Sequence, residues 1–288
     1  MRAFLLLAAC ADAFTSTHSF EALPAPRGEP ATDERCERCM SVCYTDDARA
    51  VNKWLNKNAA GAAALGFDTE TARAFAGRKD PGPGPHVLQI AAGDDVLVAQ
   101  LVSGDVCASR VLADVLSDRA VVKVGVGLDD DAIELYNRDS RLALCGRLDI
   151  GGPRNARAIA LRTVAHRAIG GPIAPKAKKI ATSNWAMRRL QSKQLAYAAR
   201  DAWLGAAIFD ALAADPAFTD AAAAQIHGEM KIDELSAVAA DRRVIKRRLK
   251  ALDEDAEDYD ARVREIRREL KQFPRPDPRL DLDIFADD

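Results

Sequence analysis

Short apolar runs alternate with helical patterns through the middle of the chain, and this alternation limits the fold more than any other feature. Four runs of strand length occupy residues 63–67, 87–91, 96–101 and 120–126. The turn sequence Gly93-Asp94-Asp95 separates the second run from the third and predicts a hairpin. Helical periods occupy residues 48–55, 106–116, 129–136, 161–169 and 191–212. Hairpin strands followed by alternating strands and helices indicate an α/β domain with a mixed sheet, which we place at residues 46–215.

The first 45 residues lack this alternation. Met1 and Arg2 precede a short apolar run at residues 3–9, and Ala11-Asp12-Ala13 then has the small-x-small form of a signal-peptide cleavage site. The apolar run is too short to cross a bilayer as a helix, which takes about 20 residues. Residues 14–45 are rich in Pro, Thr, Glu, Asp and Arg without an apolar period. We therefore predict a targeting presequence and linker over residues 1–45.

Phe14 directly follows the Ala-Asp-Ala site and precedes Thr15, Ser16 and Thr17. This arrangement resembles the bipartite plastid-targeting presequence of algae with complex plastids, in which a phenylalanine follows the signal cleavage site. The resemblance implies a plastid location, and a plain signal peptide would imply a secretory route. A nuclear or cytoplasmic location is the alternative to both. No other apolar run is long enough to span a membrane, so no membrane association of the mature protein is expected.

The C-terminal region, residues 216–288, carries a single heptad register. Its a and d positions, with Arg242 as the polar exception, are Leu235, Val238, Ile245, Leu249, Leu252, Ala256, Tyr259, Val263, Ile266, Leu270 and Phe273. Such a repeat predicts a long coiled-coil-like helix that either pairs with another helix, including one from a second copy of the chain, or folds back on the domain. Three prolines at positions 274, 276 and 278 end the pattern.

The net charge and the cysteine content exclude a chain that is basic throughout and a scaffold built on disulfides. The chain of 288 residues has a formal net charge of −2, so it is not basic as a whole, and its six cysteines are too sparse for a disulfide framework. Cys36, Cys39 and Cys43 form a C-x2-C-x3-C cluster. A closed zinc site needs four ligands, and no fourth Cys or His lies nearby, so reduced thiols are favoured over zinc.

Acidic residues close the first predicted strand. Asp68 and Glu70 are two residues apart, so in a strand their side chains point to the same face. Carboxylates held close together repel each other unless a cation lies between them, and oxygen ligands suit Mg²⁺ or Mn²⁺. Taken alone, the pair also fits a solvated strand end.

Two further motifs follow along the chain. The strand at residues 120–126 leads through glycines into a helix that opens with Asp129, Asp130 and Asp131. Favourable charge at a helix N-terminus explains such a run equally well, and periodicity does not decide which aspartate points inward. Tyr197 and Asp201 are four residues apart in a predicted helix and therefore share one face.

Together and in this order, the three motifs resemble those of the DEDDy branch of the 3′-5′ exonucleases, the group that contains ribonuclease D and the exonuclease domain of Werner-type proteins. The matching residues are Phe67-Asp68-Thr69-Glu70, the G-V-G-x-x-x-D pattern that selects Asp131, and Tyr197-x3-Asp201. Ser183-Asn184-Trp185 also looks like the Werner-type subgroup, whereas Trp203 stands where a tyrosine is more usual. The resemblance covers about residues 50–212 and implies an α/β, ribonuclease H-like fold with a mixed five-stranded sheet flanked by helices, followed here by the long heptad helix.

The resemblance also implies an activity. It implies a hydrolase that cleaves phosphodiester bonds at the 3′ end of single-stranded or 3′-ended DNA or RNA and releases nucleoside 5′-monophosphates. Two divalent cations, Mg²⁺ or Mn²⁺, would be held by Asp68, Glu70, Asp131 and Asp201, and Tyr197 would orient the attacking water. The Werner-like details favour DNA, but the choice between DNA and RNA stays open.

Two other classes of function compete with this one. A catalytically inactive nucleic-acid-binding or scaffold protein could keep the fold and use the heptad helix for assembly, but the presence of all four acids speaks against it. An unrelated metal-dependent phosphoesterase would have no need of the ordered Tyr-x3-Asp motif.

Basic residues concentrate between the second and third motifs. From residue 147 to residue 200 there are 12 Lys or Arg and one acidic residue. Such a local excess predicts a phosphate-binding surface, with a solvated basic face as the plainer alternative. The residues assigned to nucleic-acid binding are Arg154, Arg157, Arg162, Lys176, Lys178, Lys179, Arg188 and Arg189. Trp185 and His86 are candidates for stacking on a base, although burial in the core is the expectation for Trp185.

Overall fold

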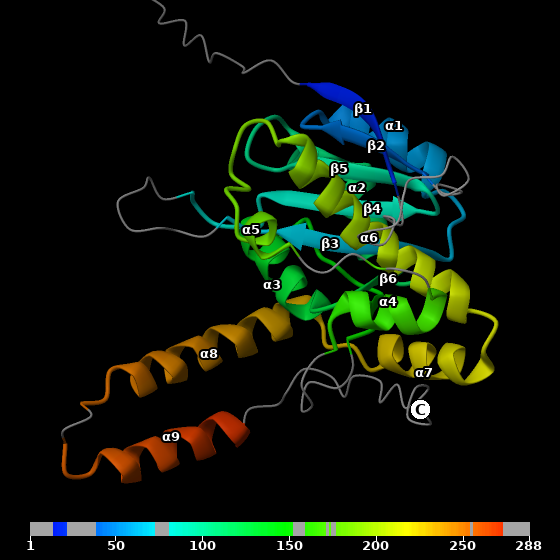
Figure 1. Ribbon diagram of the computed structural model, residues 1–288. Coiled ribbons are helices and arrows are strands. Elements are labelled where there is room, and N and C mark those ends of the chain that lie inside the picture. The colour runs from blue at the N-terminus through cyan, green and yellow to red at the C-terminus, as the bar shows by residue number, and fades with distance from the viewer. Residues whose placement is uncertain are drawn as a thin grey trace, which may run out of the picture.

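A mixed sheet of seven strands forms the centre of the computed structural model, which describes residues 14–21, 39–72, 81–151, 159–170, 173, 177–253 and 256–272 (Figure 1). The strands are β1 (Thr15–Glu21), β2 (Cys39–Thr45), β3 (Ala64–Glu70), β4 (Val87–Ala92), β5 (Asp95–Gln100), β6 (Val122–Gly125) and β7 (Arg147–Asp149). Their order across the sheet is β1-β2-β5-β4-β3-β6-β7. The pairs β2–β5, β3–β6 and β6–β7 are parallel, and the other three pairs are antiparallel.

Five neighbouring strands, β5-β4-β3-β6-β7, correspond to the mixed five-stranded sheet that the family resemblance implies. The other two correct the prediction of a linker over residues 14–45, because Thr15–Glu21 and Cys39–Thr45 are paired strands. Alternate residues Met40, Val42 and Tyr44 of β2 are buried, whereas β1 is a mostly polar edge strand. A polar edge strand pairs through its backbone and needs no apolar period. The polar composition of residues 15–21 therefore gave no sign of β1.

The position of β2 also bears on the cysteine cluster. Cys39 and Cys43 are four residues apart on this strand, so they are separated by about 13 Å. That separation is too large for both to bind one zinc ion, whose bonds to sulfur are about 2.3 Å long. Cys43 is a free thiol, and Cys36 lies outside the described residues.

Helices cover both faces of the sheet (Figure 1). The long α6 (Ser192–Leu212) lies across one face, where it contacts β2, β3, β4, β5 and β6 and is packed in turn against α4 (Leu161–Ile169). The opposite face is covered by α1 (Ala48–Asn58), α2 (Arg110–Ser117) and α3 (Leu128–Arg138), whose apolar residues share a core with Leu65, Phe67 and Leu88. The short elements are η1 (Val106–Ala108), α5 (Lys178–Ala181) and α7 (Pro216–His227).

Two glycines allow α6 to approach the sheet closely. A Cβ atom on Gly66 of β3 would lie 1.9 Å from the carbonyl oxygen of Ala202 and 2.7 Å from the amide nitrogen of Ala206. A Cβ atom on Gly205 of α6 would lie 2.4 Å from the carbonyl oxygen of Val124 in β6. Helix backbone and strand backbone therefore touch directly at this crossing, and no larger residue fits at either position.

The heptad region forms two helices, so the prediction of one long helix is wrong. Helix α8 (Ile232–Lys250) ends before the acidic segment at residues 251–258, and α9 (Tyr259–Gln272) runs back alongside α8 (Figure 1). That segment holds five acidic residues in eight, and like charges close together destabilise a helix. Described heptad residues such as Leu235, Ile245, Val263 and Ile266 are buried, so the apolar seam closes within the chain. Among the described residues, no helix is long and apolar enough to cross a membrane.

Substitution of Gly66 tests the close crossing of β3 and α6. We expect Gly66→Ala to lower the free energy of unfolding by about 3 kcal/mol, because the added methyl group meets backbone atoms that cannot turn aside. Gly93→Ala is the control, since its Cβ atom meets nothing within 4 Å and only its positive φ opposes the change, at about 1 kcal/mol. Urea unfolding followed by circular dichroism measures both. Equal losses for the two variants would contradict the close contact.

Candidate active site

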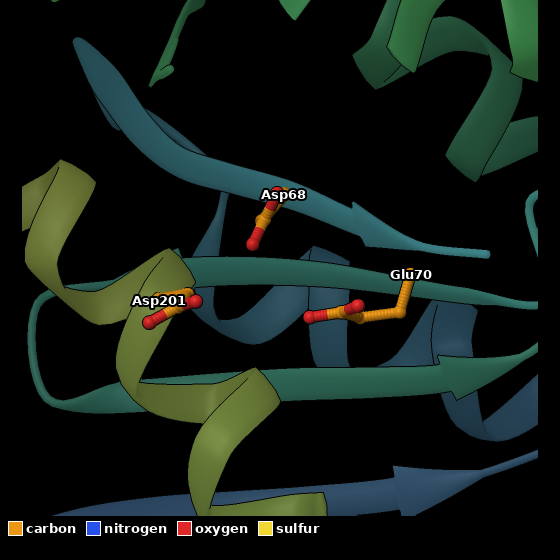
Figure 2. A group of neighbouring side chains, drawn as sticks. All are labelled: Asp68, Glu70 and Asp201. Atoms are coloured by element: carbon orange, nitrogen blue, oxygen red, sulfur yellow. The ribbon is translucent and has the colours of Figure 1, made fainter. Parts of the chain in front are cut away.

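Three carboxylates from two elements meet on the α6 face of the sheet. One oxygen atom each from Asp68, Glu70 and Asp201 lies within 4.8 Å of the other two. Asp68 and Glu70 are alternate residues of β3 and so point to the same face, and Asp201 reaches them from α6. Figure 2 shows the three side chains pointing toward one another. Gly66 lets α6 touch β3 at Ala202, the residue after Asp201. The close crossing of the two elements therefore brings Asp201 within reach of Asp68 and Glu70.

The cluster is electrostatically unfavourable without a cation. Three negative charges within 4.8 Å of one another repel, and Asp201 is only 5% exposed, so water screens its charge poorly. Carboxylate oxygens are the ligands that Mg²⁺ and Mn²⁺ prefer. The donor set therefore fits divalent metal ions.

Asp131 lies beside this cluster at the start of α3. Its carboxylate accepts a hydrogen bond of 2.5 Å from the hydroxyl of Thr69, the residue between Asp68 and Glu70. Burial raises the pKa of Asp131 well above its ordinary value, and the charge of Asp68 raises it further, while the hydrogen bond from Thr69 opposes the shift. The structure thus brings Asp131 into electrostatic contact with Asp68, although its oxygen atoms are outside the three-residue group.

The neighbouring aspartates of the acidic run have other surroundings. Asp130 is exposed. Asp129 is buried and forms an ion pair of 3.0 Å with Arg147, which also donates hydrogen bonds to the carbonyl oxygens of Leu144 and Met230. The geometry therefore assigns Asp129 to the support of α3 and leaves Asp131 as the aspartate of the run that faces Asp68.

Opposite effects on stability should separate these two aspartates. In chelator, Asp129→Asn should lower the free energy of unfolding by about 3 kcal/mol, because it removes the nearer of the two carboxylates that pair with the buried Arg147 and leaves Glu229 alone. Asp131→Asn should raise it by about 1 kcal/mol, because it removes repulsion from Asp68 while the amide oxygen still accepts the Thr69 hydroxyl. Thermal unfolding of both variants measures the difference. Changes of the same sign would contradict the division of roles.

Tyr197 lies one helical turn before Asp201 and is 4% exposed. Burial raises the pKa of its hydroxyl well above the ordinary value, and the charges of Asp201 and Glu70 add to the shift. The ring centroid is 6.0 Å from that of Trp185 and 5.2 Å from the Cζ atom of Arg162. Tyr197 is therefore a neutral hydrogen-bond donor at physiological pH and not a base.

Arg162, in the first turn of α4, contacts the acidic cluster directly. Its Nη2 atom is 2.8 Å from a carboxylate oxygen of Asp201, and its side chain is 12% exposed. The Nε atom is buried without a hydrogen-bond partner. Arg162, Asp68 and Asp201 line a cavity of about 370 Å³ between α4 and the sheet. A guanidinium group at the wall of this cavity suits an anion such as a phosphate.

Because Arg162 and a metal ion are alternative partners of the same Asp201 carboxylate, removal of Arg162 should strengthen metal binding. We expect Arg162→Gln to bind Mn²⁺ at least about tenfold more tightly than the unmodified protein, which corresponds to one charged hydrogen bond that no longer has to break. Calorimetric titration measures the affinity. Arg110→Gln is the control, because it removes an equally charged but exposed group on α2. Unchanged or weaker binding in Arg162→Gln would exclude competition at Asp201.

The other basic residues of the segment 147–200 differ in exposure, and only some of them lie on the surface. Lys178, Lys179, Arg188 and Arg189 are exposed, as a nucleic-acid-binding surface requires, while Arg154, Arg157 and Lys176 lie outside the described residues. Arg147, which contributes to the local excess of positive charge, is buried in ion pairs with Asp129 and Glu229 and is not part of such a surface. His86 and Trp185 are also buried, so neither is available to stack on a base, as expected for Trp185.

Sequence patterns did not reveal every residue of the site. Thr69 and the ion pair between Arg162 and Asp201 depend on contacts between distant segments, and no spacing rule points to them. The signal that was available for Thr69 is its place between two acids of one strand.

Comparison with known proteins places this geometry in a family. A 3′-5′ exonuclease family model matches residues 43–215, well over half of the chain. The mouse exonuclease 3′-5′ domain-containing protein 2 is 30% identical over 203 residues, which cover 66% of this chain and 30% of that protein. The human protein of the same name is 33% identical over 121 residues, covering 40% of this chain and 19% of that protein. The chain thus spans less than a third of the length of these curated relatives.

A solved structure agrees on the fold. Ribonuclease D of Escherichia coli superposes with a TM-score of 0.51 at 17% identity, over 78% of this chain and 60% of that one. Enzymes of the matched family use divalent metal ions, and the carboxylate cluster supplies ligands of the kind that such ions take. The chain belongs to the 3′-5′ exonuclease family of hydrolases, in its DEDDy-type branch.

Proposed function

We propose that the chain removes nucleotides one at a time from the 3′ end of a nucleic acid and releases nucleoside 5′-monophosphates. The main support for this proposal is the cluster formed by the carboxylates of Asp68, Glu70 and Asp201, which lies beside the buried side chain of Tyr197. An inactive scaffold is not favoured, because such a protein gains nothing from holding three carboxylates together against their repulsion.

Two divalent cations, Mg²⁺ or Mn²⁺, fit this donor set. Asp68, Glu70 and Asp201 would hold one ion, and Asp68 with Asp131 would hold the other. When bound, such ions activate water and stabilise the charge on the leaving oxygen. Asp68 takes part in both groups, which agrees with its place between Asp131 and the cluster.

The residues around the carboxylates would position the reactants. Tyr197 keeps its proton, so its hydroxyl can donate a hydrogen bond that orients the attacking water or the phosphate. Arg162 would bind a phosphate oxygen with its Nη2 group once Asp201 binds a metal ion instead. The exposed Lys178, Lys179 and Arg188 would contact the strand farther from its end, where charge alone supplies affinity for either DNA or RNA.

Digestion of labelled strands tests the proposal. The protein is incubated with RNA and with DNA labelled near the 3′ end, in Mn²⁺, in Mg²⁺ and in chelator. We expect mononucleotides to appear with a metal and not with chelator, and Asp201→Asn to reduce the rate by about a thousandfold or more because a metal ligand is lost. Tyr197→Phe should reduce it by on the order of a hundredfold, since only orientation is lost.

Arg110→Gln serves as the control in this assay and should digest both substrates at the rate of the unmodified protein. Circular dichroism must show that every variant is folded. Digestion at an undiminished rate by Asp201→Asn, or products longer than one nucleotide, would contradict the assignment.

A further inference from the structure

The backbone nitrogen of Phe14 lies on a buried carboxylate. It donates a hydrogen bond of 2.6 Å to Oδ1 of Asp46, which follows β2 and has no exposed surface. The other oxygen, Oδ2, accepts the hydroxyl of Ser103 at 2.8 Å. Among the described residues, no cationic side chain forms an ion pair with Asp46. A buried carboxylate served by neutral donors alone is costly, and a positive charge beside it would relieve that cost.

Phe14 itself is held firmly at this point. Its side chain is 6% exposed and packs edge-on against Tyr44, with ring centroids 4.7 Å apart. The guanidinium of Arg189 covers the ring at 4.2 Å from the centroid. The carbonyl oxygen of Phe14 accepts the hydroxyl of Thr45 at 2.7 Å and the amide of Asp46 at 3.2 Å. Phe14 is thus an integral part of the core and not a linker residue.

The sequence before Phe14 has the form of a cleaved leader. The small-x-small triplet Ala11-Asp12-Ala13 puts the expected cut between Ala13 and Phe14. We propose that this bond is hydrolysed during maturation and that the new α-ammonium group of Phe14 forms an ion pair with Asp46. Water adds across the peptide bond under the action of a signal-type peptidase, Ala13 leaves as a carboxylate, and the amine of Phe14 takes up a proton.

Cleavage at this bond converts the neutral amide donor into a charged ammonium donor without moving either atom. An α-amino group has an ordinary pKa of about 7.7–8.0 and is largely protonated at neutral pH. The ammonium adds Coulomb attraction to a bond whose acceptor is already ionised, and the short distance between Phe14 and Asp46 suits such a pair.

Tyr44, the residue against which Phe14 packs, is joined by hydrogen bonds to the segment that precedes the catalytic helix α6. The hydroxyl of Tyr44 donates to Oε1 of Gln100 at 2.9 Å and accepts the amide of Leu190 at 2.8 Å. Gln100 in turn donates to the carbonyl oxygen of Met187. Residues 187–190 lead into α6, which carries Tyr197 and Asp201. A mature N-terminus seated on Asp46 would therefore steady the segment that begins the catalytic helix.

The position of β1 favours a plain signal peptide over a bipartite plastid-targeting presequence. A bipartite presequence would lose a second piece after Phe14, but Thr15–Glu21 form β1 along the whole length of β2. Loss of that strand would expose β2 and remove Phe14 from the core. We infer that no second cut follows the one at Phe14 and that β1 stays in the mature protein, as in export by a plain signal peptide.

N-terminal sequencing gives the first test. The full chain, produced in cells with a secretory pathway, should be recovered with Phe14 as its first residue. Any other mature N-terminus, or a chain that retains residues 1–13, would overturn the proposal.

Thermal unfolding of processed and unprocessed protein gives the second test. We expect the processed form to melt roughly 2–6 °C higher, and this advantage should vanish in Asp46→Asn. Asp210→Asn, an exposed carboxylate on α6, should retain the advantage. If Asp46→Asn does not fold, acetylation of the α-amino group of the processed protein removes the charge instead and should abolish the gain. A gain that survives acetylation, or no gain at all, would overturn the ion pair.

The pH dependence supplies a third check. An ammonium group stabilised by Asp46 has a raised folded pKa, so its contribution is complete below about pH 7.7 and is lost as the pH rises through the folded value. Burial raises the pKa of the adjacent Tyr44 to about 12, so its hydroxyl does not titrate in this range. An advantage of the processed form that does not fall between pH 8 and pH 10 would contradict the ion pair. None of these outcomes depends on nuclease activity.

Discussion

The direct backbone contact between β3 and α6 is the constraint on which the rest of the molecule depends. Gly66 and Gly205 let the two elements touch, with a Cβ atom on Gly66 only 1.9 Å from a carbonyl oxygen of the helix. At any greater separation, Asp201 would not reach the two acids of β3. The same crossing fixes Tyr197, which lies one helical turn before Asp201 on α6. The packing of α6 on β3 therefore sets the geometry of the whole candidate site.

This geometry runs against the stability of the fold. Three neighbouring carboxylates, a fourth with a raised pKa and a buried tyrosine next to them all disfavour the charged state of the site. Arg162 and Thr69 offset part of the repulsion through an ion pair and a hydrogen bond. Sites that hold unfavourable groups together are common where a protein performs chemistry, because the groups are arranged for a ligand and not for the unliganded chain.

Sequence patterns predicted the parts of the site that follow from local geometry. Residues i and i+2 of a strand or i and i+4 of a helix share a face whatever surrounds them, so Asp68 with Glu70 and Tyr197 with Asp201 could be paired in advance. The partners of Arg147 and Arg162 could not, because a basic residue looks the same in sequence whether it faces solvent or a buried carboxylate. Strand β1 was missed for a similar reason, since its identity comes from pairing with a strand 17 residues further along the chain.

The buried Glu229 extends the folding unit beyond the homologous region. Its carboxylate accepts the amides of Gly146 and Arg147 at the start of β7 and pairs with Arg119, although it lies 14 residues after the family match ends at residue 215. A fragment cut at that boundary would leave two amides of an edge strand unsatisfied, would remove the carboxylate that pairs with Arg119, and would leave Arg147 with Asp129 alone. Boundaries for expression drawn from homology alone would therefore yield an unstable product, and the smallest self-sufficient piece reaches at least to Met230, whose carbonyl oxygen also binds Arg147.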